Sequence, residues 1–120
     1  SSKTYVLFLP ENEIHELGLL YLNYELLLKG NKTIYLGQNL PLDNLKCFFD
    51  YKEDLCFITS LTVQPYKAKI KDYFNQVENL LESSKHEFIA IGRKTSLLKA
   101  KDYKSNISFC DSIADILKII

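Results

Sequence analysis

Five short apolar segments constrain what this 120-residue chain can fold into more than any other feature of its sequence. Most of them are continuous and lack the alternation of apolar and polar positions that a strand with one solvated face shows. Parallel strands that are covered on both faces have such continuous segments. The segments therefore predict the strands of a buried parallel sheet, at residues 5–9, 33–36, 55–59, 88–91 and 107–109.

The five stretches that alternate with these segments look helical. Apolar residues recur every three or four positions across residues 70–81, which is typical of an amphipathic helix. Pro41 suits the first turn of another helix, and Asp111 or Ser112 offers an N-cap for a final helix at 113–120. This alternation predicts one three-layer, flavodoxin-like α/β domain, with a doubly wound parallel sheet in the strand order 2-1-3-4-5.

The predicted helix at residues 17–28 differs from the others because it is apolar nearly all round. A helix that covers one face of a sheet needs only one apolar stripe. We expect its outer face to meet a missing domain or another subunit of a homo-oligomer. The alternative is a helix that loops simply bury.

The charge balance excludes one class of function for this chain alone. Lysine plus arginine equals aspartate plus glutamate at 15 each, so the formal net charge is zero. Binding to DNA through phosphates is driven by counterion release and needs a visibly basic surface. If the protein acts on DNA, we expect the DNA-binding part to lie outside this chain.

The cysteines indicate the setting in which the chain works. Cys47, Cys56 and Cys110 form no C-x-x-C pair, which excludes a zinc ribbon and a thioredoxin-like motif. Cys56 lies in an apolar segment and is expected to be buried. A reduced, cytoplasmic setting fits best. Neither a signal peptide nor an apolar stretch long enough to cross a bilayer is present, so we expect no membrane partner.

Polar residues follow three of the predicted strands at one edge of the sheet. In open parallel sheets, ligands bind beyond the carboxyl ends of the strands, where the strand order reverses. Residues 10–18 and 60–62 should meet at that point, with Gly92 and Arg93 at the same edge. His86 precedes the fourth strand, at the opposite edge, and we assign it no role.

The first of these loops carries a recognisable motif. Residues 13–18 read Glu-Ile-His-Glu-Leu-Gly, which resembles the D-x-H-x-x-G signature of cobalamin-binding domains, with glutamate in place of aspartate. Together with KGNK at 29–32 and YLGQNLPL at 35–42, this variant resembles the corrinoid domain of MerR-type, adenosylcobalamin-dependent, light-responsive repressors of carotenoid synthesis. The resemblance extends more loosely to the C-terminus.

The resemblance implies roles for three residues of this loop. His15 would be the lower axial ligand of cobalt in a corrinoid bound base-off, for which a neutral imidazole is well suited. Glu13 would accept a hydrogen bond from the other ring nitrogen and so fix the tautomer. Gly18 would let the backbone pass close to the displaced nucleotide tail, which enters a slot between the sheet and the helices.

Two further segments match the tail-binding positions of the family in part. Ser60 and Thr62 fit its S-x-L or S-x-T sequence, in which the serine hydroxyl hydrogen-bonds dimethylbenzimidazole. Gly92 corresponds to the first of two successive glycines, but Arg93 replaces the second. Two alternatives stay open for Arg93: it reaches the phosphate of the tail, or it fills the slot. Since an unpaired buried charge is costly, its side chain must point outward or find a partner.

The resemblance implies that residues 3–120 form the sensory domain of a transcription regulator, and not an enzyme. A helix-turn-helix head and a helical bundle would precede the domain, and adenosylcobalamin would drive subunit association on DNA until light breaks the cobalt–carbon bond. Two alternatives stay open. One is a degenerate domain that keeps only an oligomerisation role, and the other is a corrinoid carrier domain of a methyltransferase or mutase.

Residues at the strand ends exclude three other functions of this topology. A phospho-receiver domain needs an aspartate at the end of the third strand, where Thr59 and Ser60 stand. A flavodoxin needs a hydroxyl-rich phosphate loop, but residues 10–13 read Pro-Glu-Asn-Glu and would repel phosphate. A cysteine phosphatase needs C-x5-R, which the single arginine, Arg93, does not complete.

Overall fold

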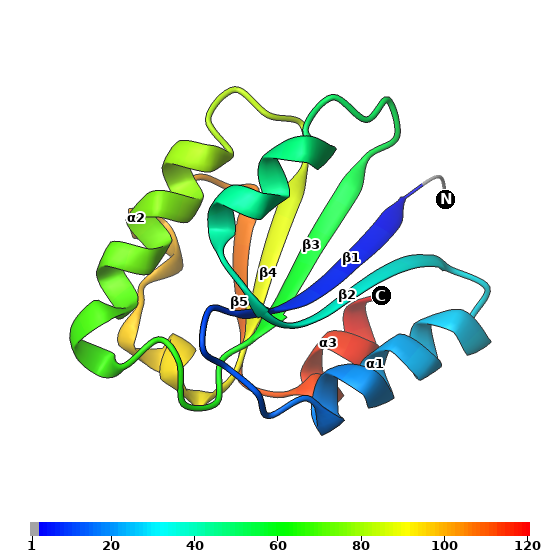
Figure 1. Cartoon of the computed structure of the whole chain (residues 1–120), viewed down its shortest axis with the longest axis horizontal. Coiled ribbons are helices and arrows are strands. Elements are labelled where there is room, and N and C mark those ends of the chain that lie inside the picture. The colour runs from blue at the N-terminus through cyan, green and yellow to red at the C-terminus, as the bar shows by residue number, and fades with distance from the viewer. Residues whose placement is uncertain (1–2) are drawn as a thin grey trace.

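The computed structural model describes residues 3–120 and confirms the predicted sheet. Five parallel strands lie side by side in the order β2-β1-β3-β4-β5 (Figure 1). The strand order reverses between β1 and β3, so the binding edge expected of this fold is at the ends of these two strands. The strands are Thr4–Pro10 (β1), Lys32–Leu40 (β2), Leu55–Ser60 (β3), Glu87–Ile91 (β4) and Ile107–Cys110 (β5).

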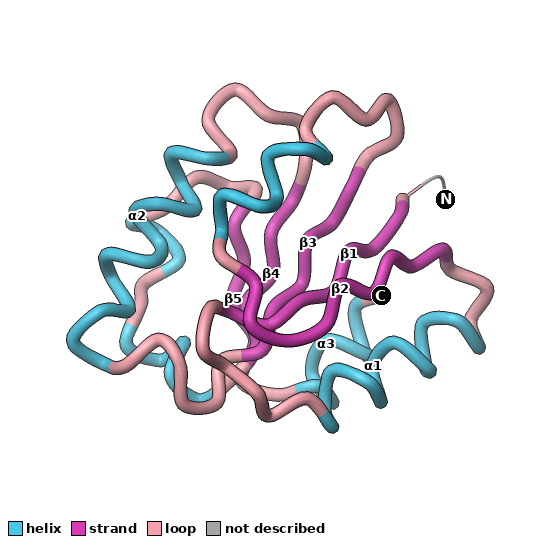
Figure 2. The backbone as a smooth tube through the Cα atoms, viewed as in Figure 1, coloured by secondary structure: helices cyan, strands magenta, loops and turns pink. Residues whose placement is uncertain are grey.

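Helices cover both faces of the sheet, which gives the predicted three layers. α1 (Leu17–Leu28) and α3 (Ile113–Ile119) lie side by side on one face (Figures 1 and 2). α2 (Ile70–Leu80) and a 3₁₀ helix at Leu42–Phe48 lie on the other. The flavodoxin-like, doubly wound architecture is therefore confirmed.

The sheet separates two buried apolar clusters. Because successive side chains of a strand point to opposite faces, Phe8 and Phe57 pack under α2, whereas Leu7, Cys56 and Ile58 pack under α1 and α3. All seven residues of β1 and the first five of β3 are buried. The central strands have no solvated face, which explains why their apolar segments are continuous.

The helix predicted to begin at Pro41 is present, as the 3₁₀ helix Leu42–Phe48. The segment is short, and it contains Asp43 and Asn44, whose side chains compete with the backbone for hydrogen bonds and weaken an α-helix. Short helical segments of this kind close more readily as 3₁₀ turns.

The helical connection predicted between β4 and β5 is present as two short 3₁₀ helices, Arg93–Leu97 and Ala100–Asp102. The buried side chains of this connection are Thr95 and Leu98. Two buried positions form too short an apolar stripe to hold an α-helix against the sheet.

The opposite edge of the sheet holds His86, which is almost fully buried. Its Nδ1 accepts a hydrogen bond from the backbone N–H of Leu55 at 3.1 Å, and its Nε2 lies 3.4 Å from the carbonyl oxygen of Phe49. The ring also packs edge-on against Phe57. These contacts give His86 a structural role at the start of β3 and β4.

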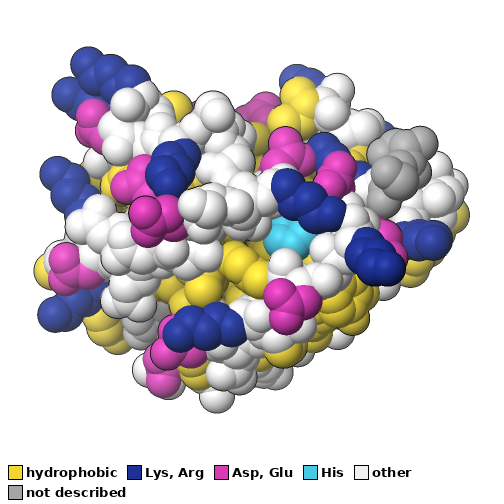
Figure 3. All heavy atoms as spheres, turned by 90° about the horizontal axis from the view of Figure 1, so that it is seen from above, with side chains coloured by type: hydrophobic (Ala, Val, Ile, Leu, Met, Phe, Trp, Pro, Cys, Tyr) yellow, Lys and Arg dark blue, Asp and Glu magenta, His cyan; other side chains and the backbone are white. Residues whose placement is uncertain are grey.

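The surface seen from above Figure 1 mixes the two signs of charge (Figure 3). Lysine and arginine side chains alternate with aspartate and glutamate over this face, without a large patch of one sign. Among residues 3–120, no helix is both long enough and apolar enough to cross a membrane.

α1 has one buried and one exposed apolar face. Leu19, Leu22 and Leu26 are buried against the sheet. Large apolar side chains also cover the outer face, with exposed fractions from 46% to 83%: Leu17, Leu20, Tyr21, Tyr24, Leu27 and Leu28. The alternative that loops bury this helix is therefore wrong for the described part of the chain.

Candidate functional site

The loop after β1 carries the predicted histidine, and β2 holds it in place. The carbonyl oxygen of Pro10 accepts a hydrogen bond from the N–H of Glu13 at 2.9 Å. The side-chain oxygen of Asn39 accepts from the N–H of Asn12 at 2.8 Å, and the N–H of Asn39 donates to the carbonyl oxygen of Glu13 at 3.2 Å. Asn12 and Asn39 have φ angles of 68° and 59°, which asparagine tolerates better than most residues. The loop is thus fixed to the edge of the sheet.

Glu13 is buried at the centre of this loop, with 1% of its surface exposed. Its Oε2 accepts hydrogen bonds from the backbone N–H of Ile14 at 3.0 Å, and from the backbone N–H and ring Nδ1 of His15 at 2.9 and 2.7 Å. Its Oε1 accepts from the N–H groups of Val63 and Gln64 at 2.6 and 2.7 Å. One carboxylate therefore connects the histidine loop to the loop after β3.

These hydrogen bonds decide the charge of Glu13. Burial by itself raises the pKa of the carboxyl group, but the donors on Gln64, His15 and Val63 outweigh burial and lower the pKa from its ordinary 4.5 to about 2. Glu13 is therefore ionised at neutral pH and acts only as a hydrogen-bond acceptor.

His15 presents its second ring nitrogen to solvent. Because the Glu13 carboxylate only accepts, we assign the proton of their contact to Nδ1, which leaves the lone pair of the neutral ring on Nε2. The His15 side chain is 57% exposed, and the nearby residues Ile14 and Leu17 also have exposed side chains. The predicted hydrogen bond between Glu13 and His15 is confirmed.

This pair has the form of an imidazole that a carboxylate orients toward a metal. Across residues 3–120, no group of three or more histidine, cysteine, aspartate or glutamate side chains is arranged to hold a metal ion. A metal at His15 would therefore have to bring its other ligands with it, as a metallated cofactor does.

Residues of the 35–42 segment hold the start of α1. Glu16, at the N-cap position of α1, accepts a hydrogen bond from the Tyr35 hydroxyl at 2.8 Å and from the Gln38 amide at 3.3 Å. Burial and the Glu16 carboxylate raise the pKa of Tyr35, so its hydroxyl stays a donor. Sequence reasoning missed Glu16, Tyr35 and Gln38 as site residues, although all three lie in the quoted motif segments.

Four other predicted site residues come together around one cavity of about 320 Å³ at the ends of β3 and β4. They are Ser60, Thr62, Gly92 and Arg93. The Arg93 side chain is exposed and makes no ion pair within residues 3–120, so its charge points outward. Arg93 therefore lies at the mouth of the cavity and does not fill it.

Gly92 has a structural reason to be glycine. Its φ angle is 137°, and a Cβ there would lie 2.5 Å from the carbonyl oxygen of Leu61. The N–H of Leu61 also donates to the carbonyl oxygen of Ile91 at 2.8 Å, which draws the two loops together. The close approach of two backbones requires this glycine, independently of any ligand.

Gly18 lies apart from that cavity. It is in the first turn of α1, where a Cβ would stand 2.9 Å from Cδ1 of Ile113 in α3. The glycine therefore lets α1 pack closely on α3. Ile113 also lines the cavity, so this residue separates Gly18 from the four cavity residues.

Lys94 is a further residue of the site, and no sequence signal points to it. Its ammonium group donates to the carbonyl oxygens of Val63 and, at 2.9 Å, Pro65. The loop after β3 is thus held by Lys94 at its carbonyl groups and by Glu13 at the N–H groups of Val63 and Gln64. Because all of its partners are backbone atoms, their residue types carry no information about this contact.

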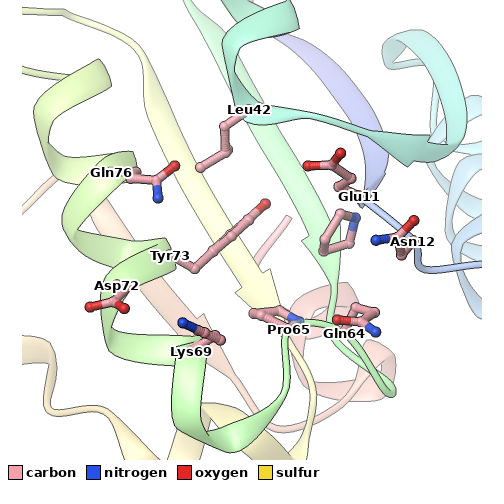
Figure 4. A pocket seen from close by; sticks show the side chains of 10 residues that line it. Glu11, Asn12, Leu42, Gln64, Pro65, Lys69, Asp72, Tyr73 and Gln76 are labelled. Carbon is pink, nitrogen blue, oxygen red and sulfur yellow. The ribbon is translucent and has the colours of Figure 1, made fainter.

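A second cavity, of about 330 Å³, lies on the other side of this loop (Figure 4). It is bounded by Glu11 and Asn12 after β1, by Gln64 and Pro65 after β3, and by α2 with Tyr73. None of the seven predicted site residues lines it. The loop after β3 contributes to both cavities, with Gln64 and Pro65 lining this one and Leu61 and Thr62 lining the other.

No model of a known protein family matches the sequence, and no curated protein matches it. The fold, in contrast, is similar to solved structures. The monomethylamine corrinoid protein of Methanosarcina barkeri superposes with a TM-score of 0.74 at 17% identity, over 99% of this chain and 57% of that chain. The methanol:cobalamin methyltransferase complex MtaBC of the same organism gives 0.67 at 20% identity, over 97% and 44%. This chain thus spans about half the length of the chains that it matches, and shares its flavodoxin-like fold with them.

Proposed function

We propose that this chain is a corrinoid-binding sensory domain in which His15 is the axial ligand of cobalt. The observation that carries the proposal is the Glu13–His15 pair, in which 2.7 Å separates Oε2 from Nδ1 and Nε2 is left to solvent. A carboxylate that holds one ring nitrogen raises the basicity of the other and fixes its direction. The similarity in fold to a corrinoid protein supports the proposal.

The residues around His15 fit a flat, metallated ring. A corrin surrounds cobalt with its own nitrogen atoms, so one imidazole from the protein is enough. Ile14 and Leu17, close to His15 in the sequence, have exposed side chains and offer apolar surface that such a ring could cover. A bound corrinoid would supply a reactive cobalt, His15 would hold it while Glu13 orients the imidazole, and Ser60, Thr62 and Arg93 would offer polar contacts from the cavity that they line.

At finer detail, we assign the domain to a MerR-type regulator with adenosylcobalamin as its ligand, and not to an enzyme. The glutamate variant of the motif, together with the segments at 29–32 and 35–42, supports this assignment. The exposed apolar face of α1 fits association with a helical bundle or a second subunit. The zero net charge leaves DNA binding to a part of the polypeptide outside this chain.

Hydroxocobalamin titration of the purified chain tests the function, with the visible spectrum as readout. We expect a shift from imidazole ligation in the wild type, weak because the chain supplies one face only. The shift should be lost in His15→Ala. Glu11→Gln, in the same loop and exposed, should behave as wild type. A folded wild-type chain without any shift would leave the degenerate oligomerisation module as the correct assignment.

A corrinoid carrier domain is the second candidate, and the fold similarity to part of a methyltransferase complex favours it. Light distinguishes the two. For a regulator, adenosylcobalamin should raise the sedimentation coefficient of the chain in the dark, and irradiation should reverse the rise. For a carrier domain, the sedimentation coefficient should not respond to light.

A further inference from the structure

Ile113 lines the same cavity as Ser60, Gly92 and Arg93. All residues around this cavity come from the ends of β3 and β4 and from the start of α3. Ile113 also contacts α1, because its Cδ1 lies 2.9 Å from the position that a Cβ of Gly18 would take. The space between the sheet and the two helices is therefore closed where Ile113 meets Gly18.

Behind Ile113 the layer is densely packed. Ile113 contacts a cluster of aliphatic side chains from the sheet, α1 and α3 that are at most 2% exposed: Leu9, Leu19, Leu22, Ile58, Ile91 and Ile116. A group as large as a nucleotide base enters this layer only by displacing such side chains. Forcing extra volume into a packed core is unfavourable, so the layer resists it.

Because this layer is closed, the site should distinguish corrinoids that carry a nucleotide tail from corrinoids that lack one. A complete cobalamin carries its own base on a nucleotide tail, and His15 reaches the cobalt only after that base has left. The base is tethered, so its effective concentration at the metal is high and it competes strongly with His15. Burial of the released tail in the domain would offset this competition, but Ile113 lines the cavity of Ser60, Gly92 and Arg93 and packs against the apolar cluster behind it.

We infer that this site binds corrinoids that lack the lower nucleotide tail, of which cobinamide is the simplest, more tightly than it binds complete cobalamins, and that Ile113 determines this preference. The inference rests on the proposed function, because it requires His15 to be the axial ligand. A corrinoid without a tail has no tethered base to displace and needs no space between the sheet and the helices.

Parallel titrations of the chain with aquacobalamin and with diaquocobinamide test the inference, with the spectrum of imidazole-ligated cobalt as readout. We expect cobinamide to bind at least ~10-fold more tightly. Ile113→Val removes the Cδ1 atom that contacts Gly18, and Ile113→Ala removes more of the side chain. Both should lower the ratio of the two affinities by strengthening cobalamin binding. Ile119→Ala, at an exposed position of the same helix, should leave the ratio unchanged.

The outcomes separate the inference from the function on which it rests. If neither corrinoid gives the spectrum, the proposed function fails. If both give it and cobalamin binds as tightly as cobinamide, the inference is overturned and the function stands. The inference is also overturned if the ratio is the same in the wild type and in the folded Ile113→Val chain. Thermal melts of each variant establish that it is folded.

Discussion

At the scale of single residues, Glu13 makes the free energy of unfolding of the domain depend on pH. Its pKa is about 2 in the folded chain, against an ordinary 4.5. A folded-state pKa below the unfolded value means that the stabilisation is complete above about pH 4.5 and is lost as the pH falls toward 2. We expect the free energy of unfolding to fall by on the order of 3 kcal/mol across this window, measured by urea unfolding.

Two variants in the same loop test this assignment. Glu13→Gln should remove most of the pH dependence, because the group that titrates is gone. Glu11→Gln should retain it, since Glu11 is exposed. An unchanged pH profile in the Glu13→Gln chain would contradict the prediction.

Gly92 and Gly30 form a matched pair for testing why glycine is needed. Both have positive φ angles, 137° and 85°, but a Cβ at Gly92 meets the Leu61 carbonyl oxygen at 2.5 Å, whereas a Cβ at Gly30 meets nothing within 4 Å. We expect Gly92→Ala to lower the free energy of unfolding by about 3 kcal/mol or more, and Gly30→Ala by about 1 kcal/mol. Chemical denaturation measures both, and equal losses would rule out a role for the contact with Leu61.

Local contacts of the site could be predicted from the sequence, and remote ones could not. A carboxylate two residues before a histidine reaches its ring through local geometry, so the pairing of Glu13 with His15 was predictable. The N–H groups of Val63 and Gln64 lie 50 and 51 residues away from Glu13. Every residue type except proline has such a group, so the sequence contains no sign of these contacts.

At the scale of elements, the loop after β3 depends on Lys94. Lys94→Met removes the donors to the carbonyl oxygens of Val63 and Pro65 while keeping the length of the side chain. We expect a loss of about 1–2 kcal/mol in the free energy of unfolding and faster hydrogen exchange in residues 61–66. Lys99→Met, at an exposed position, should change neither. Equal exchange in the two variants would show that Glu13 alone holds the loop.

The predicted strands were correct, whereas the helix type of two connections could not be predicted, and one physical reason explains both outcomes. Strands buried on both faces leave a continuous apolar segment that the sequence displays directly. The connections at Leu42–Phe48 and Arg93–Leu97 are short and bury few side chains, so hydrogen bonding within each segment decides their geometry. The strand–helix alternation predicts that a connection exists but not its helix type.

At the scale of the whole molecule, the outer face of α1 should govern association. Replacing Leu20 and Leu27 with lysine changes two exposed positions, so we expect a change in the free energy of unfolding of no more than about 1 kcal/mol. Sedimentation should show less self-association than in the wild type. Leu22→Lys, at a buried position of the same helix, should unfold the chain instead. Identical sedimentation of the double variant and the wild type would exclude this face from self-association.

The arrangement of the whole sheet could be predicted, but whether a slot is open between the sheet and the helices α1 and α3 could not. Strand–helix alternation and the reversal point follow from element order, and these place His15, Ser60 and Gly92 at one edge. The closed layer at Ile113 depends on how α3 packs against Gly18, a contact between the two ends of the chain. Only the three-dimensional packing of side-chain volumes reveals whether a slot is open or filled.

The Glu13 carboxylate, which the loops after β1 and β3 share, should couple these two loops in both directions. The imidazole of His15 and the amide groups of Val63 and Gln64 draw on the same negative charge. Coupling between two sites is thermodynamically reciprocal. A ligand that binds the His15 ring should therefore change the strength of the hydrogen bonds from Val63 and Gln64 to Glu13, and a movement of Val63 and Gln64 should change the basicity of the ring. The buried carboxylate of Glu13 is thereby enough to couple the loop after β1 to the loop after β3.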